Sequence, residues 1–164
     1  MDILRPMSGL SLFLADARAT DRLGRAMADR LRPGDTVLLE GDLGAGKSHL
    51  ARAVIQSMQA RTGPVEDVPS PTYTLVQTYS AGGTEIVHAD LYRLGDPSEL
   101  DELGLEEAMG QAVCLIEWPD RLDRVPPDAL RVALSAEGEG RRARLSGAAG
   151  WEARLAALRE VAGA

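Results

Sequence analysis

The sequence contains no asparagine, one cysteine, one phenylalanine and one lysine. Because it has a single thiol, Cys114, the chain cannot form a disulfide within itself, so we expect a reducing, cytoplasmic environment. Its longer apolar runs, such as residues 112–116, fall far short of the ~20 residues that span a bilayer. Four aspartates among the first thirty residues argue against a secretory signal. We therefore expect no association with a membrane.

The chain is acidic, with 25 aspartates and glutamates against 18 lysines and arginines and a net charge of −7. Binding of nucleic acid by an isolated protein needs a basic surface that displaces counterions, so this charge balance argues against it. If RNA belongs to the biology, we expect another protein to hold it. A bound nucleotide is a separate case, because a loop, a lysine and a metal ion can neutralise its charge locally.

Hydrophobic periodicity divides the chain into alternating helices and strands, which predicts an α/β fold. Amphipathic stretches indicate helices, continuous apolar runs indicate buried parallel strands, and alternating segments around glycine turns indicate hairpins. The expected helices are residues 15–31, a helix that starts near Gly46 and runs through residue 58, residues 97–110 and a short closing helix from residue 151. The expected strands are residues 36–40, 72–79, 84–88, 112–118, 129–135 and 141–146.

Residues 41–48 match the phosphate-binding pattern G-x-x-x-x-G-K-[ST], with a buried strand before them and an amphipathic helix after them. Glycines let successive backbone N–H groups point at phosphate oxygens, and the helix N-terminus adds further donors. We expect Lys47 to reach the β- and γ-phosphates and the Ser48 hydroxyl to bind Mg²⁺. The expected cofactor-binding residues of this loop are Gly41, Asp42, Leu43, Gly44, Ala45, Gly46, Lys47 and Ser48.

The alternative interpretation of this loop is a glycine-rich turn that ends in Lys-Ser by chance. The use of lysine argues against it, because the other 17 basic residues are all arginines. A compact ammonium suits the phosphate cradle, whereas a planar guanidinium would crowd it. The sequence therefore predicts a single-domain P-loop NTPase sandwich over residues 1–164, with parallel central strands and antiparallel edge hairpins. Residues 125–164 are expected to supply edge strands and the closing helix.

Two acidic residues follow expected strands at positions suited to a metal ion or a water molecule. Glu117 ends the apolar run 112–116, which is the Walker B pattern and predicts a carboxylate beside the phosphate loop. Asp90 follows the strand 84–88 and is a second candidate for Mg²⁺ or for the attacking water. Both residues also have structural interpretations, since many buried strands end in an acid and Asp90 is suited to capping the next turn.

Four residues within or beside these motifs also have both a functional and a structural interpretation. Their positions alone favour Trp118 and His88 as structural side chains and Arg93 as a surface charge. Thr72, within the segment 70–74, would contact a γ-phosphate if this segment were a switch loop, whereas a turn leading into a strand is the simpler interpretation.

Four motifs occur together in one order and spacing: Gly41–Ser48, Ser70–Val76, His88–Leu94 and Ile116–Pro119. In this combination the chain resembles the bacterial tRNA threonylcarbamoyladenosine biosynthesis ATPase family, of the TsaE or YjeE type, over about residues 12–122. The resemblance implies an enzyme that binds ATP and Mg²⁺ and hydrolyses the ATP. It also implies that hydrolysis supports turnover of the machinery that attaches a threonylcarbamoyl group to the adenosine beside the tRNA anticodon.

The partners implied by the resemblance are the transferase subunit and its paralogous scaffold subunit, with tRNA contacted only indirectly. We identify no arginine finger within the sequence, and an arginine supplied by a partner would predict slow hydrolysis by the isolated chain. Ser48 stands where the family often has threonine, and both residues offer one hydroxyl. By matching motif positions, the resemblance assigns Lys47 to the phosphates, Ser48 and Glu117 to Mg²⁺, Asp90 and Trp118 to activity, and the Thr20 region to the adenine.

Three other functions also use a P-loop. A small-molecule kinase is the main alternative, and it would need an acceptor pocket and an arginine-rich lid, to which Arg121 and Arg124 are candidate contributors. A GTPase recognises guanine through Asn-Lys-x-Asp, which a chain without asparagine cannot contain. A nucleotide-regulated binding module with negligible hydrolysis is the third alternative.

Overall fold

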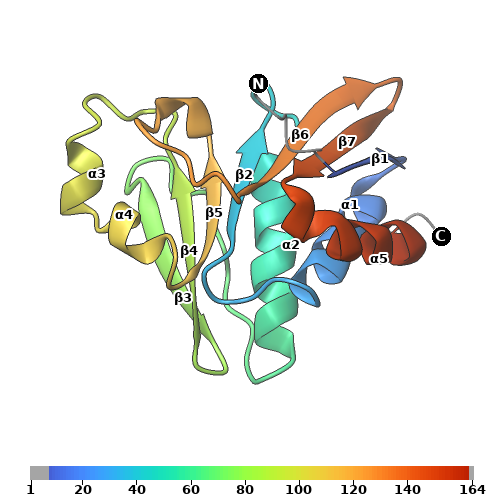
Figure 1. Cartoon of the computed structure of the whole chain (residues 1–164), viewed down its shortest axis with the longest axis horizontal. Coiled ribbons are helices and arrows are strands. Elements are labelled where there is room, and N and C mark those ends of the chain that lie inside the picture. Colours follow the sequence, from blue (N-terminus) through green and yellow to red (C-terminus); the bar gives the residue numbers. More distant parts are fainter. Residues whose placement is uncertain (1–7, 163–164) are drawn as a thin grey trace, which may run out of the picture.

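A seven-stranded mixed sheet runs through the computed structural model, which describes residues 8–162. The strands lie in the order β1-β7-β6-β2-β5-β4-β3 (Figure 1). Their bounds are β1 Ser8–Leu14, β2 Thr36–Glu40, β3 Val76–Ala81, β4 Thr84–Asp90, β5 Val113–Glu117, β6 Leu130–Glu137 and β7 Gly140–Gly147.

The four central strands β6, β2, β5 and β4 run parallel, and antiparallel pairs lie at both edges. On one edge β3 and β4 form a hairpin, and towards the other edge β6 and β7 form a second one, outside which β1 pairs with β7. Parallel strands are covered on both faces, which explains why every residue of β5 is buried. The predicted α/β fold, with a parallel centre and antiparallel edge hairpins, is confirmed.

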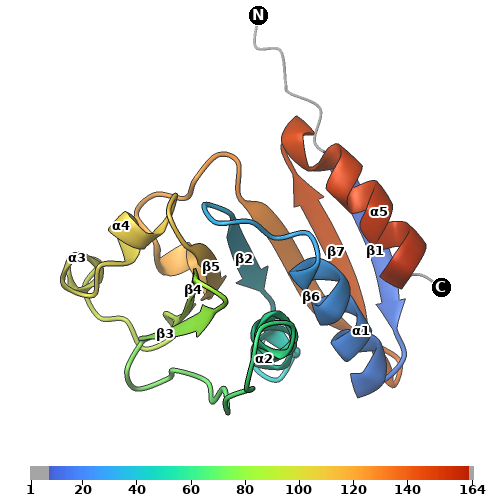
Figure 2. The same cartoon turned by 90° about the horizontal axis from the view of Figure 1, so that it is seen from below.

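Helices cover both faces of this sheet (Figure 2). Leu39 of β2 belongs to a core shared with α1, α2 and α5, whereas the neighbouring Leu38 belongs to a second core shared with α3 and α4. Alternate side chains of a strand point to opposite faces, so two adjacent leucines stabilise two layers. Among residues 8–162, no helix has both the length and the apolar character that a membrane crossing requires. The helices are α1 Ala17–Ala28, α2 Lys47–Ala60, α3 Glu99–Glu102, α4 Leu105–Ala108 and α5 Glu152–Ala162.

The first strand, β1, is absent from the sequence-based prediction. It pairs antiparallel with β7 along its whole length, from Ser8 opposite Gly147 to Leu14 opposite Arg141. Leu10 and Leu12 are buried, whereas Phe13 between the inward positions is half exposed. This alternation is short, and the pairing partner lies more than a hundred residues away in the sequence, so local pattern alone gave little support for a strand.

The predicted strand over residues 72–79 is wrong in its first half. Residues 72–74 form a turn, which closes with a hydrogen bond of 2.7 Å from the Leu75 N–H to the Pro71 carbonyl. Leu75 has φ 68°, a left-handed conformation that a strand does not contain. Regular pairing with β4 therefore begins only at Val76.

The helix predicted over residues 97–110 is two short helices, α3 and α4, rather than one. Gly104 separates them with φ 72°. A glycine in this left-handed conformation ends a helix at little cost, so the acidic segment folds as two turns with a break between them. Leu100 and Leu105, one from each helix, are both buried in the core beneath.

Candidate nucleotide-phosphate site

The phosphate loop connects the carboxyl end of β2 to the start of α2. Three of its glycines have positive φ, with 145° at Gly41, 79° at Gly44 and 106° at Gly46. Glycine adopts such angles without the strain that a Cβ would add. Gly41 is also closely packed, because a Cβ there would lie 2.5 Å from the carbonyl oxygen of Leu134 in β6. The backbone shape of the loop therefore requires glycine at these motif positions.

Lys47 is the first residue of α2, and its side chain folds back over the loop. Its Nζ donates to the carbonyl of Gly41 and, at 2.9 Å, to the carbonyl of Asp42, and it lies 4.2 Å from the centroid of the Trp118 ring. Burial lowers the pKa of the ammonium below its usual value, although nearby carboxylates act in the opposite direction. The loop therefore holds a partly desolvated cation that an anionic ligand would stabilise.

The carboxylate of Glu117, at the end of β5, joins the phosphate loop to β4. Ser48 Oγ donates to its Oε1 at 2.8 Å, and His88 Nε2 lies 2.6 Å from its Oε2. His88 and Glu117 are almost completely buried, with exposed fractions of 0% and 2%. The hydrogen bonds thus fix both oxygens of this carboxylate, one toward α2 and one toward β4.

The oxygens of Ser48 and Glu117 fit a Mg²⁺ site. Mg²⁺ prefers oxygen ligands in octahedral geometry at 2.0–2.1 Å, so two adjacent ligands lie about 2.9 Å apart. The separation of 2.8 Å between the Ser48 hydroxyl and Glu117 Oε1 is close to that value. Within residues 8–162, no cluster of three or more histidine, cysteine, aspartate or glutamate side chains is placed to hold a metal by itself. Such an ion would need phosphate and water oxygens as further ligands.

Asp90 of β4 stands opposite Glu117 of β5 in the parallel register. Its Oδ2 accepts hydrogen bonds from the hydroxyls of Ser70 at 2.9 Å and Thr72 at 3.4 Å. Its Oδ1 accepts a hydrogen bond of 3.1 Å from the backbone N–H of Tyr92. The segment that carries Thr72 is therefore tied to the strand end that carries Asp90.

Trp118 follows β5 with φ 59°, which is uncommon for a residue other than glycine. Its ring contacts the Tyr92 ring, with centroids 4.9 Å apart and planes tilted by 43°, and faces the Lys47 ammonium. The ring is also packed against the core that α3 and α4 cover. Trp118 therefore both packs against the core and contacts the ammonium of Lys47.

Comparison with known proteins gives the family. The sequence model of "Threonylcarbamoyl adenosine biosynthesis protein TsaE" matches residues 14–144, which is most of the chain. The chain belongs to the TsaE family.

Relatives named "tRNA threonylcarbamoyladenosine biosynthesis protein TsaE" are similar to this TsaE-family chain over most of their length. The protein of Rickettsia felis is 39% identical over 132 residues, which cover 80% of this chain and 75% of the relative. The protein of Bacillus subtilis is 35% identical over 125 residues, which cover 75% of each. A crystal structure of Bacillus subtilis YdiB superimposes with a TM-score of 0.72 at 25% identity and covers 93% of this chain and 95% of that one.

Thr20, which the TsaE resemblance assigns to the adenine side, is buried in α1. The next residue, Asp21, pairs through Oδ1 with His49 Nε2 at 2.7 Å, and His49 follows Ser48 in the first turn of α2. This turn of α1 therefore lies beside the start of the phosphate-loop helix. No hydrogen bond joins Thr20 to residues 41–48 among those of the described residues, so its nucleotide contact stays a prediction.

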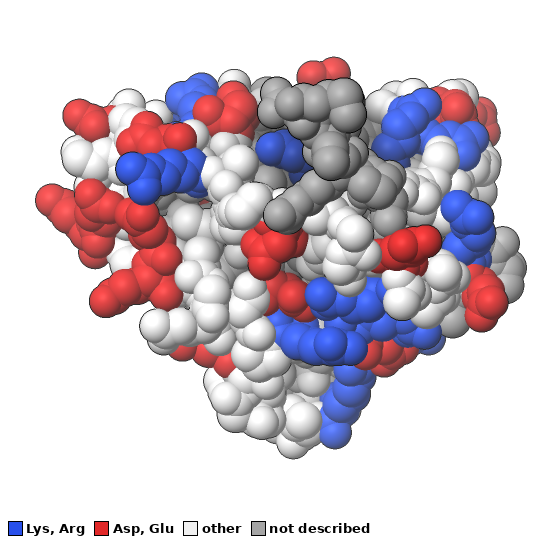
Figure 3. Space-filling model, viewed as in Figure 1, with Lys and Arg blue, Asp and Glu red and all other residues white. Residues whose placement is uncertain are grey.

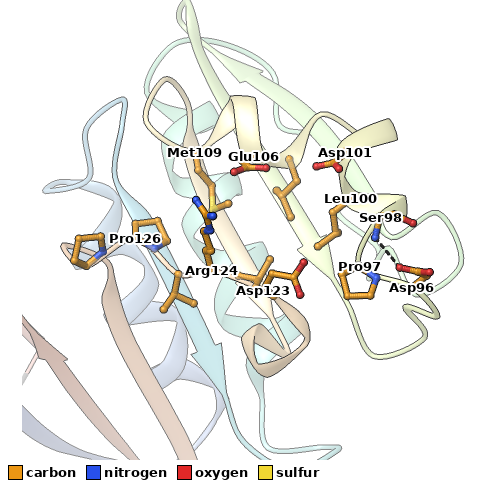
Figure 4. A pocket seen from close by; sticks show the side chains of 14 residues that line it. Asp96, Pro97, Ser98, Leu100, Asp101, Glu106, Met109, Asp123, Arg124 and Pro126 are labelled. Carbon is orange, nitrogen blue, oxygen red and sulfur yellow. Dashed lines mark hydrogen bonds between the residues drawn. The ribbon is translucent and has the colours of Figure 1, made fainter.

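A cavity and a groove lie near the site of this TsaE-family chain. A cavity of about 620 Å³ borders the start of the phosphate loop and is lined in part by Asp42, Trp118 and Asp120. A groove of about 770 Å³ lies between the α3–α4 segment and residues 122–127. Figure 4 looks into this groove, with Asp101 and Glu106 on the helices and Asp123 and Arg124 on the loop opposite. None of its lining residues belongs to the phosphate loop.

The structure brings five predicted residues of this TsaE-family chain together, with Thr72 joined to them through Asp90. The five are Lys47, Ser48, Asp90, Glu117 and Trp118. The sequence interpretation of His88 as a structural side chain missed its contact with Glu117. The available signal was spacing, because His88 lies two residues before Asp90 and so shares its side of β4.

Proposed function

We propose that this chain binds ATP with Mg²⁺ in the loop Gly41–Ser48 and hydrolyses it, as the ATPase subunit of the machinery that makes threonylcarbamoyladenosine in tRNA. One observation carries the proposal: the buried ammonium of Lys47 lies at the phosphate loop, close to the pair formed by Ser48 and Glu117. The printed names of the TsaE relatives support the biological setting.

Each residue has a task that follows from its chemistry. Lys47 and the loop N–H groups hold the β- and γ-phosphates, and phosphoryl transfer requires mainly such positioning and charge stabilisation. Ser48 and Glu117 would hold Mg²⁺, which neutralises negative charge on the phosphates when bound. Asp90, whose carboxylate is oriented by three hydrogen-bond donors, would order the attacking water.

The partners that fit this proposal are the transferase subunit and its paralogous scaffold subunit, in the cytoplasm, with tRNA contacted only through them. Hydrolysis by the isolated chain is expected to be slow, because an arginine supplied by a partner often completes such sites. Turnover is therefore measured with and without the two purified partner subunits. Fast turnover of the isolated chain that the partners leave unchanged would contradict this gating.

A small-molecule kinase is the other reaction that a P-loop of this size supports. Its acceptor would have to occupy the cavity beside the loop, and that cavity is lined by three carboxylates, Glu40, Asp42 and Asp120, against the single arginine Arg131. Glu40 and Arg131 also form an ion pair with each other. This lining disfavours anionic metabolites as acceptors in that cavity.

Calorimetric titration of ATP into the folded wild-type chain tests the proposal directly. We expect binding that strengthens with Mg²⁺, and release of phosphate that matches formation of ADP. Lys47→Ala should abolish detectable uptake, whereas Glu117→Gln should bind ATP but lose stimulation by Mg²⁺. Arg61→Ala serves as a control, because Arg61 pairs with Asp29 and Ala28 at the far end of α2. Absence of ATP binding by the wild type would refute the proposal.

A further inference from the structure

The β6–β7 hairpin contacts the phosphate loop near both of its ends. Leu134 of β6 packs against Gly41, as described above. From β7, Arg141 Nη2 donates to the carbonyl of Gly44 at 3.2 Å. Its Nη1 occupies the place that a Cβ on Gly46 would take. The guanidinium of Arg141 therefore spans the stretch of loop that leads directly into the lysine of the motif.

The hydrogen bond from Arg141 orients a peptide group of the loop. The C=O and N–H of one peptide point in opposite directions, so a donor on the Gly44 carbonyl also fixes the direction of the Ala45 N–H. That N–H donates to the Asp42 carbonyl at 3.0 Å, which closes the turn within the loop. Arg141 thus stabilises the folded shape of the loop from outside.

Arg141 also places a permanent charge beside the phosphate loop. A guanidinium stays protonated and offers five N–H donors. The hydrogen bonds of the described residues use one donor of Arg141, the bond to Gly44. The side chain is partly exposed, so its charge is available to act on a bound triphosphate.

The next residue in β7, Arg142, has different surroundings. It pairs with Glu137 at 2.7 Å, and its guanidinium lies 5.6 Å from the centroid of the Phe13 ring. Adjacent residues of a strand point to opposite faces, which explains why only one of the two reaches the loop. Arg142 has the same charge, strand and side-chain type as Arg141, so it provides a matched control.

We propose that Arg141 is a positioning residue for the nucleotide, contributed within the same chain by the C-terminal hairpin. It holds Gly44–Gly46 in the conformation that accepts phosphate, and its charge strengthens the attraction for the triphosphate. The identity of the ligand rests on the proposed function, whereas the stabilisation of the loop does not.

Three variants of the full chain, Arg141→Ala, Arg141→Lys and Arg142→Ala, test this proposal. Hydrogen–deuterium exchange of the segment 41–48 without nucleotide reports on loop order, and titration with ATP and Mg²⁺ reports on affinity. Arg141→Ala should exchange faster in this segment and bind ATP about tenfold more weakly. Steady-state kinetics should show the change mainly in KM, because the residues around Glu117 are untouched. Arg141→Lys should recover part of the affinity but not the slow exchange.

The outcomes separate this inference from the proposed function. Wild-type exchange and affinity in Arg141→Ala would overturn the inference, and so would an equal loss in Arg142→Ala. If the wild type bound no ATP, the proposed function would fail, while the exchange data would still decide whether Arg141 orders the loop. Circular dichroism and the thermal midpoint of each variant identify any general loss of folding, in which case Arg141→Gln replaces Arg141→Ala.

Discussion

Lys47 is a buried cation whose ammonium contacts two backbone carbonyls and an aromatic ring. Each of these contacts stabilises the positive charge less than a phosphate would. Burial lowers the pKa of the Lys47 ammonium from the usual 10.5. Bound phosphate would favour the charged form, so the pKa of Lys47 would be higher in the proposed nucleotide complex than in the free protein. Proton binding at this residue and nucleotide binding are therefore linked.

This linkage predicts how ATP affinity depends on pH. Affinity is full below the pKa of Lys47 in the free protein, and it falls as the pH rises above that value, because binding must then take up a proton. Since burial lowers this pKa, the fall begins below pH 10.5. Titrations from pH 7.5 upward measure it, with circular dichroism to confirm folding. Constant affinity up to pH 10.5 would contradict the prediction.

His88 provides a second prediction at the scale of single residues. Its Nε2 fixes one oxygen of Glu117, while its Nδ1 is buried and has no partner among the described residues. Residues that orient a metal ligand typically change metal affinity or activity by about 10–100-fold. We expect His88→Ala to lower Mg²⁺-dependent hydrolysis within that range and to affect ATP binding without Mg²⁺ much less.

The matched control for His88 is His49, whose hydrogen bond with Asp21 is exposed. His49→Ala should leave the Mg²⁺ dependence of hydrolysis unchanged. If both histidine variants lost the same fraction of activity, the effect would not come from orientation of Glu117. Titration of Mg²⁺ at saturating ATP, followed by phosphate release, measures the difference.

At the scale of elements, the site exists because three parallel strands end side by side. β2 leads into the phosphate loop, and the register of β4 and β5 places Asp90 opposite Glu117. The carboxyl ends of parallel strands meet at one edge of a sheet, so residues far apart in sequence meet there. The β6–β7 hairpin extends this edge and packs against the loop at Gly41.

Packing of the hairpin against the loop predicts different costs for two glycine substitutions. Gly41→Ala combines a φ of 145° with a Cβ 2.5 Å from the backbone of Leu134, whereas Gly44→Ala meets no atom within 4 Å and keeps a φ of 79°. The left-handed conformation alone costs about 1–2 kcal/mol. We expect Gly41→Ala to lower the free energy of unfolding more than Gly44→Ala, and to weaken ATP binding more.

Urea unfolding of both glycine variants, with a common slope, measures this difference. Equal unfolding midpoints would show that the loop can move away from β6 at no cost. In that case the close contact between Gly41 and Leu134 would not determine the position of the loop.

At the scale of the whole molecule, most of the net negative charge comes from one segment. Residues 96–107 contain six of the 25 acidic residues and no basic one, which leaves 19 acidic against 18 basic residues in the remainder. This segment forms α3 and α4, where Figure 3 shows the acidic side chains gathered. The rest of the chain is close to neutral, so the net negative charge that disfavours nucleic-acid binding lies mainly on the α3–α4 segment.

The charge distribution predicts weak binding of tRNA by the isolated chain. Non-specific binding of nucleic acid at physiological salt has dissociation constants of about 10⁻⁴–10⁻⁶ M for proteins with a basic surface. We expect this chain to bind tRNA more weakly than that range, by fluorescence anisotropy in 150 mM salt. Neutralising Asp101, Glu102, Glu106 and Glu107 to amides should change the affinity little, since the amides add no positive charge. Submicromolar binding by the wild type would contradict indirect contact with tRNA.

Local patterns in the sequence determined the phosphate loop, its flanking strand and helix, and the buried strand that ends at Glu117. These features depend on neighbouring residues: glycines at required backbone angles, apolar runs in buried strands, and helical periodicity. The same information indicated the parallel centre and the edge hairpins. It misplaced the start of β3, because the hydrogen bond that closes the turn at Leu75 competes with strand propensity.

Tertiary structure alone decided the remaining features. β1 forms through pairing with β7, His88 of β4 contacts Glu117 of the neighbouring strand β5, and Arg141 contacts Gly44 from a strand 97 residues further along the chain. Each of these contacts joins residues that share no local pattern, so its energy appears only when the sheet has assembled. The sequence therefore determined which groups are candidates to bind phosphate and metal, whereas the sheet decided which neighbours orient them.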